Sequence, residues 1–400
     1  VNPNNLSNPP PVFTVDDSNV MAEIQKATSN NAVVQTPILQ VSTFGWVIAF
    51  KSIRLVNNTT QQWFMTTVGN NVTLTAFYFD SVEFFSNVQL LYTGTVIVVN
   101  CYSNNSQISF STMSRDIIVM ASRFENSAIA SASSHGWSFV GCVFVGLSQL
   151  SISGSNGNVV GCVFDGASLS IQNSTNVKIV ATQFQNVSFS GVNPTVSFAG
   201  TNLSAVANAF YSYTFILYLG QGSWVSVGFN SFKDGSNLVV LVQDGATVDS
   251  VVIMGNDFYT LPTHNSFIFI TGYSQQGVPQ LTGVINVLYI AFNNFTNTSG
   301  PPYTVYGYEV YQGVYVSGLA YINIAISVNT SFISSNYFAN NGGLKGNGSK
   351  GVLGYISIQQ LNDNVKLINN LVFTFNVNEG NPAYLPPGQT YTAQFNVGIT

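Results

Sequence analysis

The hydrophobic residues of this chain recur in short segments that end in phenylalanine. Each segment alternates apolar and polar residues, followed by a small or amide residue, one further residue and Phe. The clearest segments end at Phe79, Phe124, Phe144, Phe164, Phe184, Phe210, Phe232, Phe258, Phe295 and Phe338. From Phe124 onward the spacings are 20, 20, 20, 26, 22, 26, 37 and 43 residues. Alternation with a period of two is typical of half-buried strands, and repetition near 20 residues indicates stacked repeats.

A parallel β-helix explains this periodicity. In that fold each coil of roughly 20–22 residues holds short strands and turns, and successive coils stack about 4.8 Å apart. Val, Ile and Phe then fill the interior, whereas Ser, Thr, Asn and Gln face water. We therefore predict an all-β chain that forms a right-handed parallel β-helix.

A second column runs two residues before the end of each repeat. Asn tolerates the left-handed backbone of a tight turn, and stacked amides can hydrogen-bond from coil to coil. We therefore expect a structural ladder of five Asn, whereas Cys142 and Cys162 fall on adjacent coils as free buried thiols or, alternatively, as a disulfide. The column consists of Cys101, Ser122, Cys142, Cys162, Thr182, Asn208, Asn230, Asn256, Asn293 and Asn336.

The repeats VVIMGNDF (residues 251–258) and LYIAFNNF (residues 288–295) resemble the parallel β-helix repeats of the pectin-lyase-like superfamily. The segment VDDSNVMAEIQKA (residues 15–27) is similar to the N-terminal cap of pectate-lyase-like and tailspike β-helices. Asp17 or Ser18 can N-cap a short helix there, which would close the open end of the tube. The resemblance implies the fold, but the superfamily contains lyases, hydrolases, isomerases, tailspikes and non-enzymatic adhesins, so fold alone does not give function.

The repeats divide the chain into three parts. Residues 1–55 are predicted to form an N-terminal arm, the capping helix and the first coils, and residues 56–373 the β-helix body. The long spacings after Phe258 place insertions near 272–283 and 297–318. Residues 374–400 form a C-terminal strand tail or cap, with an alternating strand over 391–397 that can also add to the edge of a neighbouring molecule.

Charged residues are scarce, which excludes several classes of protein. Lys and Arg number 10 and Asp and Glu 15 among 400 residues, or 6% charged, against about a quarter in an average globular chain. A basic surface for nucleic acid is therefore absent, and no apolar run reaches the roughly 18–20 residues of a membrane helix. Glycosylation sequons favour an extracellular glycoprotein. The candidates are Asn57, Asn71, Asn104, Asn173, Asn202, Asn294, Asn329 and Asn347.

Catalytic chemistry has one weak candidate. Glu125 and Asp165 follow the Phe column two coils apart, so their backbones should lie about 9.5 Å apart, at the outer limit for the carboxylates of inverting glycosidases. The alternative is that both are isolated turn residues on a solvated corner. The only histidines are His135 and His264, so we predict no metal site and no cofactor.

The insertion near 297–318 is rich in tyrosine, whose flat apolar face and polar tip suit sugar stacking or a protein interface. Alternatively, these side chains simply cover the sheet beneath. The binding candidates are Tyr303, Tyr306, Tyr308, Tyr311 and Tyr315. We favour a secreted, non-enzymatic adhesive or structural protein of a cell surface, filament or virion, which binds itself, other surface proteins or glycans. The alternative is a polysaccharide lyase or glycoside hydrolase of the superfamily.

Overall fold

A computed structural model shows an all-β chain, and its described residues contain no helix. The structure describes residues 76–340 except 86, 92–93, 187–193, 260–265, 274–281, 298–307, 312–313 and 318–319, together with short strands between 12 and 67 and between 354 and 394. The capping helix expected at residues 15–27 lies, apart from Val15, outside the described residues.

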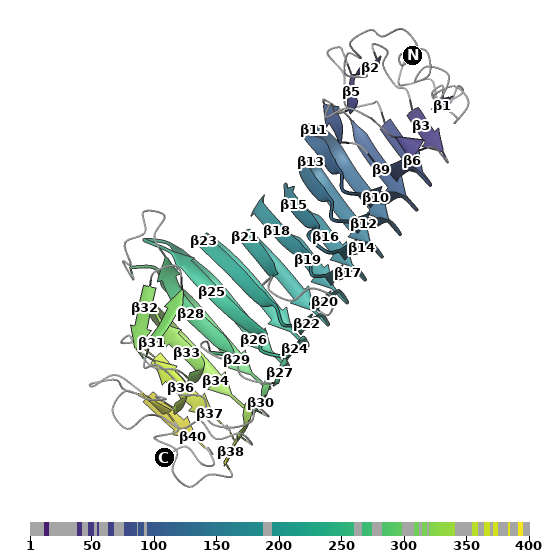
Figure 1. Cartoon of the computed structure of the whole chain (residues 1–400). Coiled ribbons are helices and arrows are strands. Elements are labelled where there is room, and N and C mark those ends of the chain that lie inside the picture. Colours follow the sequence, from purple (N-terminus) through teal and green to yellow (C-terminus); the bar gives the residue numbers. More distant parts are fainter. Residues whose placement is uncertain are drawn as a thin grey trace, which may run out of the picture. The chain divides into compact units, whose positions relative to one another are not determined.

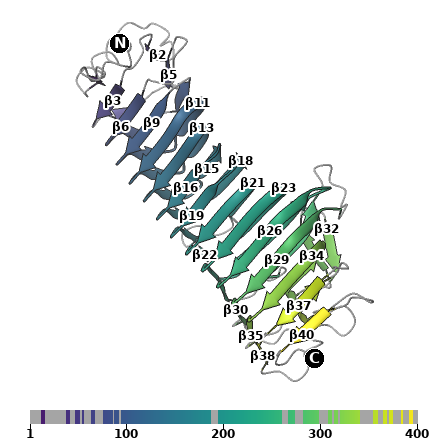
Figure 2. The ribbon, with the colours of Figure 1, turned by 180° about the vertical axis from the view of Figure 1, so that it is seen from behind.

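The chain divides into two compact units, each a parallel β-solenoid (Figures 1 and 2). Unit 1 comprises Val1–Val177 and Val187–Ser190, and unit 2 comprises Lys178–Asn186 and Gly191–Thr400. In each unit the equivalent strands of successive rungs pair in parallel and form a column. The described residues form three such columns, and the chain passes through the first, second and third in turn. The all-β parallel β-helix expected from the repeats is therefore confirmed.

Unit 1 builds its columns from short strands and from long strands that bend between the first and second columns. The first column contains β2 (Ile38–Val41), β5 (Trp63–Thr67), β8 (Val88–Leu91), the first halves of β11 (Gln107–Met120) and β13 (Ala128–Val140), β15 (Gln149–Ser153) and β18 (Ser168–Ser174). The second contains β1 (Val12–Val15), β3 (Val47–Lys51), β6 (Ala76–Asp80), β9 (Thr95–Val99), the second halves of β11 and β13, and β16 (Gly157–Val160). The third contains β4 (Arg54–Leu55), β7 (Glu83–Phe84), β10 (Tyr102–Asn104), β12 (Arg123–Glu125), β14 (Val143–Val145) and β17 (Val163–Asp165).

Unit 2 repeats this arrangement of three columns. The strand β19 (Val177–Val180) belongs to it except for Val177, which is assigned to unit 1. The first column contains the first halves of β21 (Thr195–Val206) and β23 (Thr214–Gly228), β25 (Asn237–Gln243), β28 (Ile268–Tyr273), β33 (Ala320–Ala325), β36 (Gly354–Ile358) and β39 (Ala383–Tyr384). The second contains the second halves of β21 and β23, β26 (Thr247–Met254), β29 (Val284–Ala291), β34 (Ser327–Ser334), β37 (Asn364–Ile368) and β40 (Tyr391–Gln394). The third contains β20 (Gln183–Gln185), β22 (Ala209–Tyr211), β24 (Ser231–Lys233), β27 (Asp257–Tyr259), β30 (Asn294–Asn297), β35 (Tyr337–Asn340) and β38 (Leu371–Thr374).

The phenylalanines that end the repeats form the centre of the core. From Phe124 onward, each is the inward residue of a third-column strand, and in-register pairing stacks the rings of neighbouring rungs within each unit. Phe79 lies instead in β6 of the second column. In unit 1 the ring centroids of Phe144 and Phe164 lie 4.5 Å apart with planes 10° from parallel. In unit 2 the stack runs from Phe184 to Phe338, for example 4.6 Å between Phe210 and Phe232. These contacts explain why the sequence repeats Phe rather than any apolar residue.

Unit 2 contains a continuous amide ladder at the turn before the third column. The Oδ1 of Asn230 accepts hydrogen bonds from the backbone N and the Nδ2 of Asn208, both at 2.9 Å. Its own Nδ2 donates to the Ala205 carbonyl at 3.0 Å and to the Oδ1 of Asn256 at 2.9 Å. The same pattern continues through Asn293 to Asn336. The buried amides are thus satisfied from rung to rung.

The backbone explanation for this Asn column was wrong. The left-handed residue of the turn is the one before each ladder residue, for example Ala207 (φ 58°) before Asn208 and Gly255 (φ 69°) before Asn256. Asn is required at the ladder because its side chain points inward and both donates and accepts hydrogen bonds. We call the left-handed position the corner position.

In unit 1 small polar and sulfur side chains take the place of the amides. The Sγ atoms of Cys142 and Cys162 lie 3.5 Å from the Val119 carbonyl and 3.4 Å from the Phe139 carbonyl. Cys101, Cys142 and Cys162 are all free and buried. The pKa of the Cys142 thiol is raised by its hydrogen bond with Cys162 and by burial. Of the two alternatives, the structure has the free thiols.

Three features of unit 2 concern the predicted insertions, the outer face of the first column and the tail. Within the insertion after β30, β31 (Tyr308–Tyr311) and β32 (Val314–Ser317) pair as an antiparallel hairpin. Outward residues of the first column are buried, including Val239, Leu241 and Phe269, and Tyr218 and Tyr273 pack against them. At the C-terminal side β40 pairs in parallel with β37, so this strand continues the chain's own second column.

Candidate functional site

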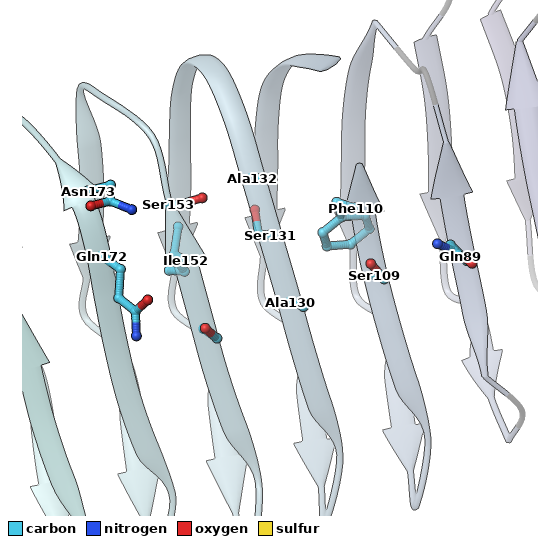
Figure 3. A pocket seen from close by; sticks show the side chains of 11 residues that line it. Gln89, Ser109, Phe110, Ala130, Ser131, Ala132, Ile152, Ser153, Gln172 and Asn173 are labelled. Carbon is cyan, nitrogen blue, oxygen red and sulfur yellow. The ribbon is translucent and has the colours of Figure 1, made fainter. Parts of the chain in front are cut away.

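A groove of about 420 Å³ crosses the first column of unit 1 (Figure 3). It spans β8, β11, β13, β15 and β18, so a ligand in it would cross five rungs. Its lining residues are Gln89, Ser109, Phe110, Ala130, Ser131, Ala132, Ser151, Ile152, Ser153, Gln172 and Asn173. All of them come from unit 1, so one unit forms the entire groove.

Strand register forms the walls of the groove from small polar side chains. Gln89, Ser109, Ala130 and Ser151 pair in register and make one outward row. Ala132, Ser153 and Gln172 make a second row, two residues further along each strand. Small residues in both rows leave the space between longer side chains open, which hollows the sheet surface.

Ser131 lies at the floor of the groove. It occupies an inward position whose in-register neighbours are Phe110 and Ile152, and it is 6% exposed. Its Oγ has no hydrogen-bond partner among the described residues. A buried hydroxyl without a partner costs about 1–3 kcal/mol, and a residue smaller than its neighbours leaves room beneath the surface. Ser131 therefore places a hydroxyl group without a partner in the described part of the chain, and less tightly packed space, at the floor of the groove.

The lining chemistry permits binding but not proton transfer. Hydroxyl and amide groups supply donors and acceptors, and Phe110 and Ile152 add apolar surface. None of the lining residues is an acid, a base or a cysteine. Such a groove suits an uncharged ligand that is rich in hydroxyl groups.

Glu125 and Asp165 lie in the third column and do not line this groove. Both pair in register with Val145 between them, so they stand two rungs apart on one column. The Tyr102 hydroxyl donates a hydrogen bond to Glu125 at 2.8 Å, and Arg123 Nε lies 2.6 Å from its other oxygen. These two contacts lower the pKa of Glu125. A general acid needs a raised pKa, so Glu125 suits a base or a structural ion pair better than an acid.

Other sequence candidates bring no further cluster together. His135 is exposed in β13, and its carbonyl accepts a hydrogen bond from Asn156 Nδ2 at 3.2 Å. Within the described part of the chain, no group of three or more His, Cys, Asp or Glu side chains can hold a metal ion. Over the same residues no helix is long and apolar enough to cross a membrane.

The tyrosine candidates stay predictions. Tyr303 and Tyr306 lie outside the described residues, and of Tyr308, Tyr311 and Tyr315 the structure gives only the backbone, in the β31–β32 hairpin. Among the sequons, Asn173 and Asn329 are exposed, and Asn104, Asn202 and Asn294 are half-buried. Asn57, Asn71 and Asn347 fall outside the described part.

Sequence reasoning missed the groove. One signal was available: Ser131 breaks the inward apolar alternation of residues 128–140, AIASASSHGWSFV. The hollow itself depends on register between five strands that are far apart in sequence. Periodicity within one repeat does not reveal it.

Comparison with known proteins finds a distant structural likeness. No protein family model matches the chain, and no curated protein matches it. Among solved structures, a mannuronic acid-specific polysaccharide family 6 lyase from the human gut microbiota aligns over 90% of this chain and 81% of its own, with 13% identity and a TM-score of 0.33.

Proposed function

We propose that this protein is a non-enzymatic, extracellular β-helix that binds uncharged glycans in the groove of unit 1. The observation that carries the proposal is the groove's lining, which is rich in hydroxyl and amide groups and contains no titratable side chain. An oligosaccharide offers hydroxyl groups along an extended chain, and a groove across five rungs matches that shape. A catalytic cleft would instead gather carboxylates or basic residues.

The wider role that we propose is adhesive or structural, at a cell surface, in a filament or on a virion. A chain with 6% charged residues has little means of attracting partners by long-range electrostatics. Contacts to other surface proteins or to further copies would then involve the insertions and the C-terminal strand. As part of the same proposal we place the chain in the pectin-lyase-like superfamily, on its repeats and its parallel solenoid.

The alternative function is a polysaccharide lyase or glycoside hydrolase with Glu125 and Asp165 as catalytic carboxylates. Their register is the observation in its favour, because two rungs separate their backbones by about 9.5 Å, near the upper separation for inverting hydrolysis. The hydrogen bonds that hold Glu125 ionised count against its role as an acid.

Binding to a panel of neutral and acidic polysaccharides, by affinity electrophoresis, tests the proposal. In Ser151→Tyr a large side chain should fill the groove, because Ser151 faces outward in the lining. Gln149→Tyr is the matched control, since Gln149 is exposed on the same strand outside the groove. We expect Ser151→Tyr to lose at least tenfold in affinity and the control to bind like the wild type.

Two results would count against the proposal. Equal binding by Ser151→Tyr and Gln149→Tyr would show that the groove is not the binding site. Release of oligosaccharides by the wild type, lost in Glu125→Gln, would establish the enzymatic alternative.

A further inference from the structure

Two phenylalanines of unit 2 occupy a backbone conformation that bulky residues avoid. Phe229 and Phe292 both have φ 55°, at the corner position, and are 64% and 60% exposed. At the same corner the other described rungs have Ser, Asn, Ala or Gly, namely Ser81, Asn100, Ala121, Gly141, Gly161, Ala181, Ala207, Gly255 and Ser335. A bulky residue with positive φ is strained, and strain of this kind concentrates at functional sites. Neither ring is buried, so core packing does not account for the choice of Phe.

The two rings lie on the same edge of the solenoid. The backbone N of Phe229 donates to the Met254 carbonyl at 3.0 Å, that of Gly255 to Ala291 at 3.0 Å, and that of Phe292 to Ser334 at 3.1 Å. The corner residues of successive rungs are therefore stacked, and Phe229 and Phe292 stand two rungs, about 9.5 Å, apart. Between them is Gly255, where a Cβ would lie 2.8 Å from Cε1 of Phe229. The ring of Phe229 thus leans across the glycine.

The adjoining outward face of the second column extends the aromatic surface. Trp224 is 45% exposed on β23, and the rings of Tyr289 and Phe332 lie 6.1 Å apart on β29 and β34. We name Trp224, Phe229, Tyr289, Phe292 and Phe332 the aromatic strip. The partly exposed outward residues among them carry no charge, for example Ser226, Val252 and Val287.

Polar groups border this surface on both sides. On the third-column side Asn294 Nδ2 donates to the Asp257 carboxylate at 3.3 Å. On the other side Asn329 Nδ2 donates to Asn286 Oδ1 at 2.8 Å, and Asp249 is exposed at the start of this face. A ligand here would meet flat apolar rings in the centre and hydrogen-bonding groups at its edges.

We propose that the aromatic strip is a second binding surface of this protein, for an uncharged glycan chain that stacks on Phe229 and Phe292. A sugar ring has an apolar C–H face that packs on aromatic rings and hydroxyl groups at its rim, which match the centre and the border of the strip. The strip covers about 400 Å², four strands by six residues, half of the roughly 800 Å² that each partner buries in a stable protein interface. Its size and lack of charge therefore favour a glycan over a second copy of the chain. The strip lies in unit 2, so it is separate from the groove of unit 1.

The experiment uses the full chain made in a bacterial host that adds no N-glycans, with cellohexaose, mannohexaose and maltohexaose as probes. Affinity is measured by isothermal titration calorimetry and position by tryptophan fluorescence, since Trp224 lies in the strip. We expect Phe229→Asn/Phe292→Asn to bind a responsive hexaose at least tenfold more weakly. Asn accepts positive φ, so the melting temperature of this variant should stay the same or rise.

The matched control is Leu147→Asn, which removes an apolar side chain that is 68% exposed in unit 1. It should leave affinity unchanged, and Ser151→Tyr should keep the fluorescence response of Trp224 even where groove binding is lost. Unchanged affinity in the double Phe variant would overturn the proposal, as would failure of every hexaose to change the fluorescence. A dimer that the double variant abolishes without any hexaose binding would assign the strip to self-association and also overturn it.

Discussion

Removal of one amide from the ladder should destabilise unit 2 far more than removal of a surface amide. Asn256 is fully buried. Its Oδ1 accepts from the backbone N and the Nδ2 of Asn230, each at 2.9 Å, and its Nδ2 donates to the Val227 carbonyl and to Asn293 Oδ1, each at 3.0 Å. Asn256→Ala removes all four hydrogen bonds at once.

The magnitude follows from what is left behind. The backbone N–H of Asn230 loses the partner it has in Asn256, and a buried group without a partner costs about 1–3 kcal/mol. The remaining bonds contribute roughly 0.5–1.5 kcal/mol each, and some of their partners keep other contacts. Together these effects predict a loss of about 3–5 kcal/mol in the free energy of unfolding.

Urea unfolding followed by circular dichroism measures this loss as a lower midpoint with an unchanged slope. The control is Asn286→Ala, which removes a half-buried amide with an exposed hydrogen bond to Asn329 and should cost less than about 0.5 kcal/mol. Equal midpoints for the two variants would show that the ladder contributes no special stability. In Asn256→Asp a carboxylate oxygen would replace Nδ2 and face the Val227 carbonyl and Asn293 Oδ1. Burial and these oxygens would raise the pKa of the new carboxyl group, so this variant should gain stability as the pH falls through that pKa.

Three further predictions concern unit 1. The hydrogen bonds from Tyr102 and Arg123 lower the pKa of Glu125, so their stabilising effect is present above the ordinary glutamate pKa and disappears as the pH falls through the lowered value. Because the chain has few other carboxylates, its melting temperature should change little between neutral pH and about pH 3. Tyr102→Phe should make this change in melting temperature smaller still. Gly157→Ala would place a Cβ 1.9 Å from the Trp137 ring and should cost at least about 2 kcal/mol in urea unfolding, whereas wild-type stability in this variant would contradict the packing described. The three buried cysteines, with the pKa of Cys101 raised to about 11 by burial, should not react with a thiol reagent at mildly alkaline pH until denaturant is added, and rapid reaction of the native protein would refute their burial.

The repeat revealed the fold because its physical cause recurs at every rung. Phe210 and Phe232 recur since parallel, in-register pairing puts identical rings on top of one another, and that pattern is visible in sequence. The hydrogen-bonded ladder at Asn208 was predicted, but its physical reason was predicted only in part. Asn is necessary there because its side chain points inward and hydrogen-bonds, and not because its backbone is left-handed. The corner position one residue earlier escaped notice, since Ala, Gly, Ser and Phe all occur there.

The candidate sites were less accessible to sequence reasoning. The groove around Ser131 results from the register of strands from five rungs, and no single segment shows that its neighbours are small at the same level. The carboxylates Glu125 and Asp165 were placed correctly on one column by counting. Counting did not show that Tyr102 and Arg123 already hold Glu125.

The amide ladder also gives unit 2 a modular length. Asn230, Asn256 and Asn293 each donate two hydrogen bonds through Nδ2 and accept two through Oδ1, to and from the neighbouring rungs. The bonding at one rung therefore does not depend on how many rungs follow. A tandem duplication of residues 209–230 would place one more Asn in the column with its partners already in position. The chain can therefore lengthen by whole rungs, since stacked repeats interact mainly with their nearest neighbours. A gain or loss of part of a rung would interrupt both the amides and the stacked rings.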